Sequence, residues 1–265
     1  MIKKKSIMGI MVTFALIAMS LQAYSQYGRP EVKVGFTGGL NLNNVAQDYD
    51  ESDMESATKM RLGFRLGAVA DYPFTDEFSL QSGILFVNKG YNVDLEEQYE
   101  DAFSVPGVDD LTVTADGESY VSYNYLEIPI NVVAKIEDFQ ISAGPYVAFN
   151  IGGKQYTDAT VDYEGEMMGM PYEGSQDIEE DSKLKPAFGE VDPEDYDDDE
   201  APVNGFDFGL NFAVGYDIDP VVINVGYSLG LGNTAPKYDI DDYDAKDYKT
   251  SNRVIYFSVS YFLEL

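Results

Sequence analysis

The sequence predicts an all-β fold, an eight-stranded antiparallel transmembrane up-and-down β-barrel, and three observations support this. Segment after segment alternates apolar with small or polar residues, which is the period of a strand and not of a helix. Most of these segments reach the ~9–11 residues that a tilted membrane-spanning strand needs, whereas soluble strands usually have about five or six. Short and long connections alternate strictly between the segments, which is the layout of barrels that span a membrane.

The clearest alternating segment runs from Phe139 to Ile151. Its odd positions carry apolar side chains, and its even positions carry small, amide and hydroxyl groups such as Gln140, Ser142 and Asn150. The odd face is therefore expected to contact lipid, and the even face suits a wet or tightly filled interior. The same period predicts the other strands at residues 32–41, 61–71, 78–90, 120–135, 206–216, 221–231 and 255–265.

The connections between these strands carry most of the acidic residues. Short turns are predicted at 72–77, 137–138 and 217–220, and long loops at 43–59, 91–119, 152–203 and 232–251. The predicted lipid faces contain no charged residue, since an Arg or Lys on that face costs about 2–4 kcal/mol at the midplane and Asp or Glu somewhat less. We therefore expect short periplasmic turns and long acidic extracellular loops.

The N-terminal residues predict export, and the predicted barrel then places the protein in the cell outer membrane. Three lysines at residues 3–5 precede an apolar run at residues 7–21, and small residues suited to cleavage follow at residues 23–25. A single transmembrane helix is the alternative, but the run is shorter than the roughly 20 residues of a helical span. We expect a signal peptide at residues 1–25 and one outer-membrane β-barrel domain at residues 26–265.

Composition limits the classes of partner. The chain of 265 residues has a formal charge of −30, and loss of the three lysines with residues 1–25 lowers this to −33. Such a charge argues against nucleic acid or an anionic lipid surface as a partner. The 21 tyrosines and 15 phenylalanines are unlike a disordered acidic chain, which would be poor in aromatic residues. Because the chain has no cysteine, it forms neither disulfides nor thiolate metal sites.

Four short runs carry a family resemblance, at residues 35–41, 63–67, 80–86 and 123–130. They resemble the small outer-membrane β-barrel proteins of the Bacteroidetes type, the porin family with its PorT-like members. The resemblance covers nearly the whole chain after residue 25 except the long acidic loops. It implies an outer-membrane barrel, but the group is named for its architecture and not for one task. The sequence departs from the usual aromatic ending of such barrels at Leu265.

Charged residues on the polar faces are expected to point into the barrel, namely Lys33, Arg61, Arg65, Glu127 and Asp207. Charges between low-dielectric walls must be paired to persist, so an ion pair between Arg65 and Glu127 is expected, with Arg61 and Asp207 in the same lumen. Eight strands leave an interior that side chains just fill. We interpret the charges as a structural plug, with a transport or gating role as the alternative, and do not expect an open general porin.

Two local features complete the sequence predictions. The pairs Gly38–Gly39 and Gly152–Gly153 are interpreted as relief at curved or loop-entering strand positions. Interfacial aromatic belts, where a tyrosine ring meets the edge of the bilayer, are expected to contain Tyr72, Tyr123, Tyr125 and Tyr227.

Catalysis finds no support in the sequence, and metal binding finds little. Histidine and cysteine are absent, which removes most nucleophile and base arrangements, and no serine motif or phosphate-binding glycine loop occurs. We therefore expect neither an enzyme nor a cofactor. The acidic runs 195–200 and 239–244 supply oxygen ligands, but they lack the spacing of an EF-hand loop. Weak binding of Ca²⁺ or Mg²⁺ is the alternative to a solvated, self-repelling loop.

The sequence thus predicts an outer-membrane barrel of structural or interaction type, with recognition left to the exterior loops. One alternative is transport of a small solute or a PorT-like accessory role in protein secretion. Another is a soluble periplasmic sandwich or barrel that binds a small ligand. The expected partners are outer-membrane lipid around the strands and a protein or surface glycan at the loops, but no nucleic acid. A monomer is the default oligomeric state.

Overall fold

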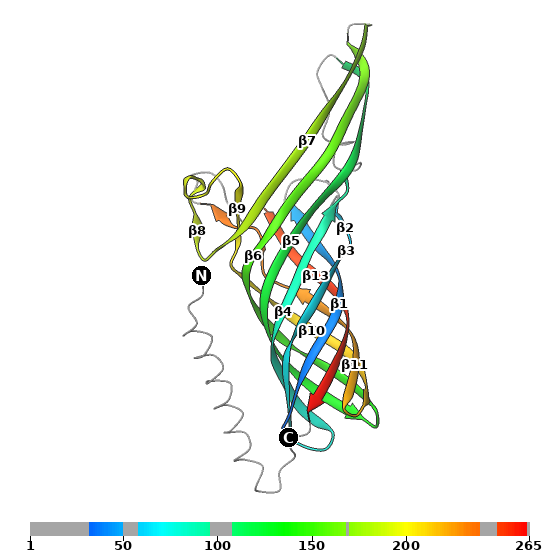
Figure 1. Cartoon of the computed structure of the whole chain (residues 1–265), viewed down its shortest axis with the longest axis vertical. Coiled ribbons are helices and arrows are strands. Elements are labelled where there is room, and N and C mark those ends of the chain that lie inside the picture. The colour runs from blue at the N-terminus through cyan, green and yellow to red at the C-terminus, as the bar shows by residue number, and fades with distance from the viewer. Residues whose placement is uncertain (1–31, 50–57, 96–107, 168–169, 239–247, 264–265) are drawn as a thin grey trace.

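The computed structural model describes residues 32–49, 58–95, 108–167, 170–238 and 248–263 (Figure 1). The expected signal peptide and the C-terminal Leu265 lie outside these residues. No helix in the described part of the chain is long and apolar enough to cross a membrane.

Eight antiparallel strands form a closed ring. They are β1 (Lys33–Tyr49), β3 (Arg61–Pro73), β4 (Phe78–Val93), β5 (Val108–Ile136), β6 (Phe139–Met167), β10 (Phe206–Ile218), β11 (Val221–Gly230) and β13 (Tyr248–Leu263). Each strand pairs with two neighbours: β13 pairs with β1, and β10 pairs with β6. The predicted eight-stranded up-and-down barrel is confirmed.

Five shorter or outlying strands and one turn of 3₁₀ helix lie outside the ring. They are β2 (Thr58–Lys59), β7 (Met170–Ala187), β8 (Glu190–Val191), η2 (Pro193–Asp195), β9 (Glu200–Asn204) and β12 (Lys237–Tyr238). Strands β7 and β9 pair in parallel, as do β12 and β8.

The two faces of the ring follow the predicted alternation. In β10, Phe206, Phe208 and Leu210 are exposed, whereas Asp207 and Asn211 at the alternate positions are buried. The apolar side chains therefore point away from the barrel axis, where an outer-membrane barrel contacts lipid. A soluble sandwich would bury this apolar face, so the closed ring does not support the soluble alternative.

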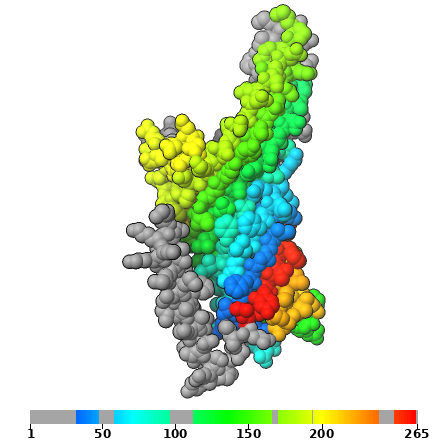
Figure 2. Space-filling view, viewed as in Figure 1, coloured from blue at the N-terminus to red at the C-terminus, as the bar shows by residue number. Residues whose placement is uncertain are grey.

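The predicted short turns are confirmed, but two of the predicted long loops contain long strands. Strands β5 and β6 continue beyond the barrel, and β7 pairs with β6 from Gly153↔Leu184 to Met167↔Met170. We call this extension the blade and define it as residues 108–119, 155–167 and 170–182. It projects from one end of the barrel (Figures 1 and 2).

The blade corrects the expectation of a fully loop-like 91–119 and 152–203. These segments are rich in acidic residues, which are uncommon in strands, but they also alternate charged residues with Thr, Val, Ala and Tyr. Pairing of three such segments buries the small apolar side chains on one side while the carboxylates stay in water. Tertiary pairing therefore outweighs the local preference for a loop.

Gly38 and Gly39 provide a matched test of how closely the strands approach. A Cβ added at Gly39 would collide with the backbone carbonyl of Phe257 on β13, whereas a Cβ at Gly38 meets no atom within 4 Å. We expect Gly39→Ala to lower the free energy of unfolding by about 1–3 kcal/mol through overpacking. Gly38→Ala is expected to raise it by about 0.4–1 kcal/mol, because alanine restricts the unfolded chain. Urea unfolding in detergent measures both, and equal stability of the two variants would contradict the close contact.

Candidate functional site

A buried lysine lies at the centre of the lumen between two carboxylates. Lys89 Nζ on β4 lies 2.9 Å from Glu127 Oε2 on β5 and 3.1 Å from Asp207 Oδ2 on β10. The side chains of all three residues are fully buried. Strands β4, β5 and β10, which belong to four consecutive strands of the ring, thus meet through one cation. Its two anionic partners keep this cation from being an unpaired charge in a low-dielectric interior.

Aromatic and amide groups complete the surroundings of Lys89. Its Nζ lies 4.3 Å from the ring centroid of Tyr146 and 5.1 Å from that of Tyr125, so both rings supply cation–π contacts. The Tyr146 hydroxyl and the Asn252 Nδ2 group both donate hydrogen bonds to Asp207 Oδ2, at 3.2 and 3.0 Å. We call Lys89, Glu127 and Asp207 the central triad. Together with Tyr146 and Asn252, the triad connects β4, β5, β6, β10 and β13 in the lumen.

Two of the four tyrosines predicted for the interfacial belts lie elsewhere. Tyr125 is fully buried beside Lys89, and Tyr123 is also buried. Tyr72 and Tyr227 are exposed on the outer surface. The belt prediction was wrong for Tyr123 and Tyr125 because these residues share the inward face with Glu127.

Arg65, the expected partner of Glu127, makes different contacts. Its guanidinium carbon lies 3.8 Å from the ring centroid of Tyr256, and its Nε donates a 3.0 Å hydrogen bond to Asn41 Oδ1. Within the described residues, no ion pair of 4.0 Å or less joins Arg65 to Glu127; Lys89 takes that place. Asp207 also lies inside the lumen, as expected, with Lys89 as its ion-pair partner.

The remaining predicted lumen cations lie towards the two ends of the barrel. Arg61 donates from Nη1 to Asn88 Oδ1 at 2.9 Å and lies over the ring of Tyr120. Lys33 forms an exposed 3.1 Å ion pair with Asp219 at the end that carries the short turns. Arg61 therefore interacts with an amide and an aromatic ring, not with an acid of the central triad.

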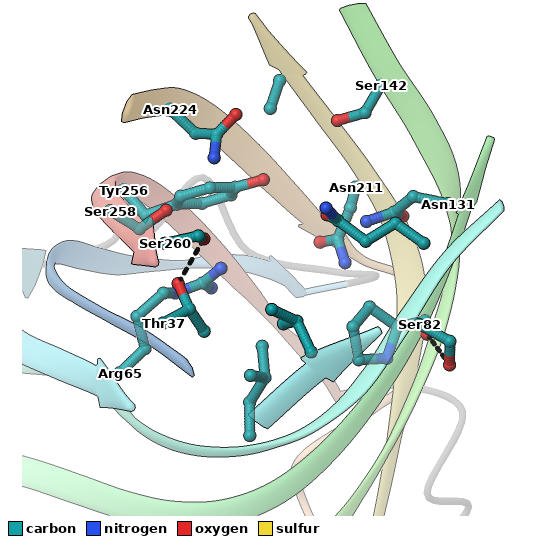
Figure 3. A pocket seen from close by; sticks show the side chains of 15 residues that line it. Thr37, Arg65, Ser82, Asn131, Ser142, Asn211, Asn224, Tyr256, Ser258 and Ser260 are labelled. Atoms are coloured by element: carbon teal, nitrogen blue, oxygen red, sulfur yellow. Dashed lines mark hydrogen bonds between the residues drawn. The ribbon is translucent and has the colours of Figure 1, made fainter. Parts of the chain in front are cut away.

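A small polar cavity of ≈ 40 Å³ lies beside Arg65 in the lumen (Figure 3). Asn131 and Asn211 reach it from β5 and β10, and Ser260 donates a 3.0 Å hydrogen bond to Thr37 at its edge. A water molecule needs at least ~10–15 Å³ of such volume, so the cavity has room for a few waters. Beyond it, Lys135 Nζ pairs with Asp71 Oδ2 at 2.9 Å.

Lys89 is the central residue that sequence reasoning missed. The segment containing it alternates less cleanly than the others, because Asn88, Lys89 and Gly90 are all buried in succession. One signal was present: Lys89 shares its parity with Leu85, whose cross-strand neighbour is Glu127. A lysine on the same inward face as a glutamate of the neighbouring strand is a pairing candidate, although alternation alone does not show how close the two side chains come.

The blade presents a second candidate site, on one of its two faces. Cross-strand neighbours lie on the same face of a sheet, and the register places Glu118, Asp158 and Glu179 in one row across β5, β6 and β7. The acidic residues on this side whose side chains the structure describes are exposed, and we call this side the acidic face. Its carboxylates belong to Asp116, Glu118, Asp158, Asp162, Glu164, Glu173, Asp177, Glu179 and Asp181.

The opposite face of the blade has an apolar centre, with Gln176 and Glu180 of β7 exposed beside it. Ala115, Ala159 and Val161 are buried there with Leu95, and Ile178 packs against them. The two faces therefore differ in character, and the buried apolar centre fixes which side chains of the blade point to water.

Ion pairs hold the base of the blade to β9. Lys183 Nζ lies 2.7 Å from Asp199 Oδ2, and Lys185 Nζ lies 2.8 Å from Glu200 Oε1. The hydrogen bond from Lys183 holds the pKa of the Asp199 carboxyl below its ordinary value. Asp197, Asp199 and Glu200 are close enough to share a cation, with ligand atoms within 4.8 Å of one another. Two of these three acids, Asp199 and Glu200, already have lysine partners. The other acidic run considered for metal binding, residues 239–244, lies outside the described residues.

The lumen and the outward apolar face define an integral β-barrel of the outer-membrane class. The model of the outer membrane protein beta-barrel domain family matches residues 24–235, and the chain belongs to this family. Its location in the outer membrane follows from this membership. No curated protein sequence matches the chain.

Solved outer-membrane proteins show similarity at low sequence identity. The attachment invasion locus protein Ail of Yersinia pestis is 12% identical, with 88% of this chain and 100% of that chain covered and a TM-score of 0.34. Neisserial surface protein A is 10% identical, with 88% and 99% covered and a TM-score of 0.34. The outer membrane protease OmpT of Escherichia coli is 10% identical, with 88% and 96% covered and a TM-score of 0.31.

Replacement of Lys89 tests the central triad. Lys89→Met leaves Glu127 and Asp207 buried without their cation, so we expect a loss of about 3–5 kcal/mol in the free energy of unfolding. Adding Glu127→Gln and Asp207→Asn removes the uncompensated charges and is expected to restore most of the loss. Arg65→Met is the matched control, with an expected loss of about 1–3 kcal/mol from an unpaired Asn41. Urea unfolding in detergent compares them, and a larger loss for Arg65→Met would contradict the assignment of Lys89 as the main partner.

The ion pair between Lys183 and Asp199 predicts a pH dependence at the base of the blade. Since folding lowers the Asp199 pKa from its ordinary 3.8, the stabilisation is present above that pH and is lost as pH falls through the lower folded value. We expect hydrogen-exchange protection of the β9 amides to fall in that acidic window. In Asp199→Asn the protection should be lower at neutral pH and should not change across the window. An unchanged acid response in this variant would assign the titration to another group.

Proposed function

We propose that this protein is a closed outer-membrane barrel that recognises a cationic protein partner outside the cell through the acidic face of its blade. The observation that supports this is the row structure of the face, in which carboxylates from three paired strands lie side by side in water. The barrel strands β5 and β6 hold the face at a fixed orientation, because they continue into it without a linker.

The acidic face is electrostatically unfavourable in the absence of a partner. Carboxylates directly opposite each other, such as Glu118, Asp158 and Glu179, destabilise a sheet. A cationic surface removes this repulsion on binding, and the field of the face raises the rate of encounter. A polyanionic glycan or an anionic headgroup would add to the repulsion, so among the partners expected at the exterior we favour a basic protein.

The lumen supports anchoring and stability in preference to transport. We assign the lumen charges Arg61, Arg65, Glu127 and Asp207 a structural role, with Lys89 at their centre. The triad lies in the interior, and the cavity beside Arg65 has room for only a few waters. An accessory role in secretion, as the PorT-like resemblance implies, is one form of this proposal because such a role needs recognition of another protein. We propose a monomer and assign no enzymatic activity.

One set of proteoliposomes containing residues 26–265 tests both parts of the proposal. We expect no sugar-dependent swelling, and we expect a lysine-rich peptide to bind with an affinity that falls as salt rises. A triple variant should weaken binding of this peptide about tenfold, because it removes about three exposed charge pairs. Its substitutions are Asp158→Asn, Asp162→Asn and Glu164→Gln.

The matched control neutralises three exposed acids away from the blade, Glu194, Asp195 and Asp198, and should retain full binding. Equal losses in the two triple variants would show that net charge alone attracts the peptide. Rapid swelling in sugars would overturn the closed lumen.

A further inference from the structure

The outer edge of β7 is open along the blade. From Met170 to Ser182 this strand pairs, within the described residues, only with β6, while β9 covers the edge from Lys183 onwards. We propose that this edge receives an extended segment of another protein, basic at alternate residues, which adds a fourth strand to the blade. The inference rests on the proposed function and specifies how the partner binds.

Hydrogen bonds at the base of the blade identify which backbone groups face outward. The Lys183 N–H donates to the Asp199 carbonyl at 2.8 Å, and the Ala187 carbonyl accepts from Gly205 N–H at 2.7 Å. Lys183 and Ala187 therefore direct their backbone groups away from β6. The β6–β7 register continues without a shift to Met170, so the other odd-numbered residues of β7 do the same.

Pro171 agrees with this assignment. It is odd-numbered and has no N–H, so it removes no hydrogen bond from the pairing with β6. The outward N–H and carbonyl groups of the open edge thus belong to Glu173, Ser175, Asp177, Glu179 and Asp181. These groups form a row of the kind to which an added strand binds.

The charges of the edge select its occupant. Glu173, Asp177, Glu179 and Asp181 belong to the acidic face, so a second copy of this edge would bring carboxylate against carboxylate. A basic strand would instead bring opposite charges together on that face. Its alternate residues would lie beside Ile178 on the other face, where small apolar side chains fit. The expected segment therefore alternates Lys or Arg with Val or Thr.

Strand β9 shows that this edge accepts an additional strand. It pairs in parallel with β7 over Lys183–Ala187, immediately beyond the open stretch. The ion pairs of Lys183 and Lys185 with Asp199 and Glu200 accompany that pairing. At the base of the blade, β7 supplies the lysines and the segment on its edge supplies the acids. Along the open stretch β7 supplies the acids, so the partner strand would supply the basic residues.

Two peptides of identical composition separate strand addition from general attraction. One repeats Lys-Val-Lys-Thr three times, and the other has the same residues in blocks, with all lysines together. Against full-length barrel in proteoliposomes, we expect the alternating peptide to bind at least about tenfold more tightly. The same peptide with N-methyl groups on alternate amides keeps its charge but cannot pair, and should lose that advantage.

Ser175→Pro removes one outward N–H without changing the charge. We expect it to weaken binding of the alternating peptide about tenfold and leave binding of the block peptide unchanged, while Ser175→Ala should match the native chain. Heat-dependent gel migration checks that the Ser175→Pro barrel is folded. If that variant does not fold, the comparison of the N-methylated and unmodified peptides on the native protein still tests strand addition. Equal binding of all three peptides would overturn strand addition and leave acidic recognition standing. No binding of any peptide at low salt would overturn the proposed function itself.

Discussion

The hydrocarbon of a membrane offers no hydrogen-bond partners to the backbone, and the rest of the structure depends on this constraint. Every backbone group in the membrane must be paired within the protein, which an antiparallel sheet achieves only by closing on itself. The first strand of the ring, β1, therefore pairs with the last, β13, from Val34↔Leu263 to Tyr49↔Tyr248. Closure sets the remaining choices: one face of each strand meets lipid, and the other faces a narrow interior that side chains must fill.

The filling of that interior follows from its dimensions. Glu127 and Asp207 face inward from different strands, and their repulsion would be large without a cation between them. Lys89 is long enough to reach both carboxylates, and the rings of Tyr125 and Tyr146 occupy the space around its ammonium group. A planar guanidinium fits better along a ring, where Arg65 stacks on Tyr256. Lys89 and Arg65 thus have different roles in the lumen because their charged groups differ in shape.

Periodicity predicted the number of strands, their faces and the inward positions of Arg65, Glu127 and Asp207. It did not predict the partner of Glu127, because alternation assigns a face but not a height along the axis or a neighbour across the lumen. The blade was missed for a different reason. Acidic residues such as Asp158 and Glu179 are poor strand formers individually, and only the pairing of three segments buries Ala159 and Val161 behind them.

The continuity of β5 and β6 from the blade into the wall has a mechanical consequence. A force that pulls outward on the blade acts along these strands, perpendicular to the hydrogen bonds that join them to their neighbours. Such a shear force is shared by the whole ladder, whereas a force across a hairpin opens its bonds one after another. A tether attached to the blade would therefore transmit tension to the membrane-embedded wall through two strands that run on from one into the other.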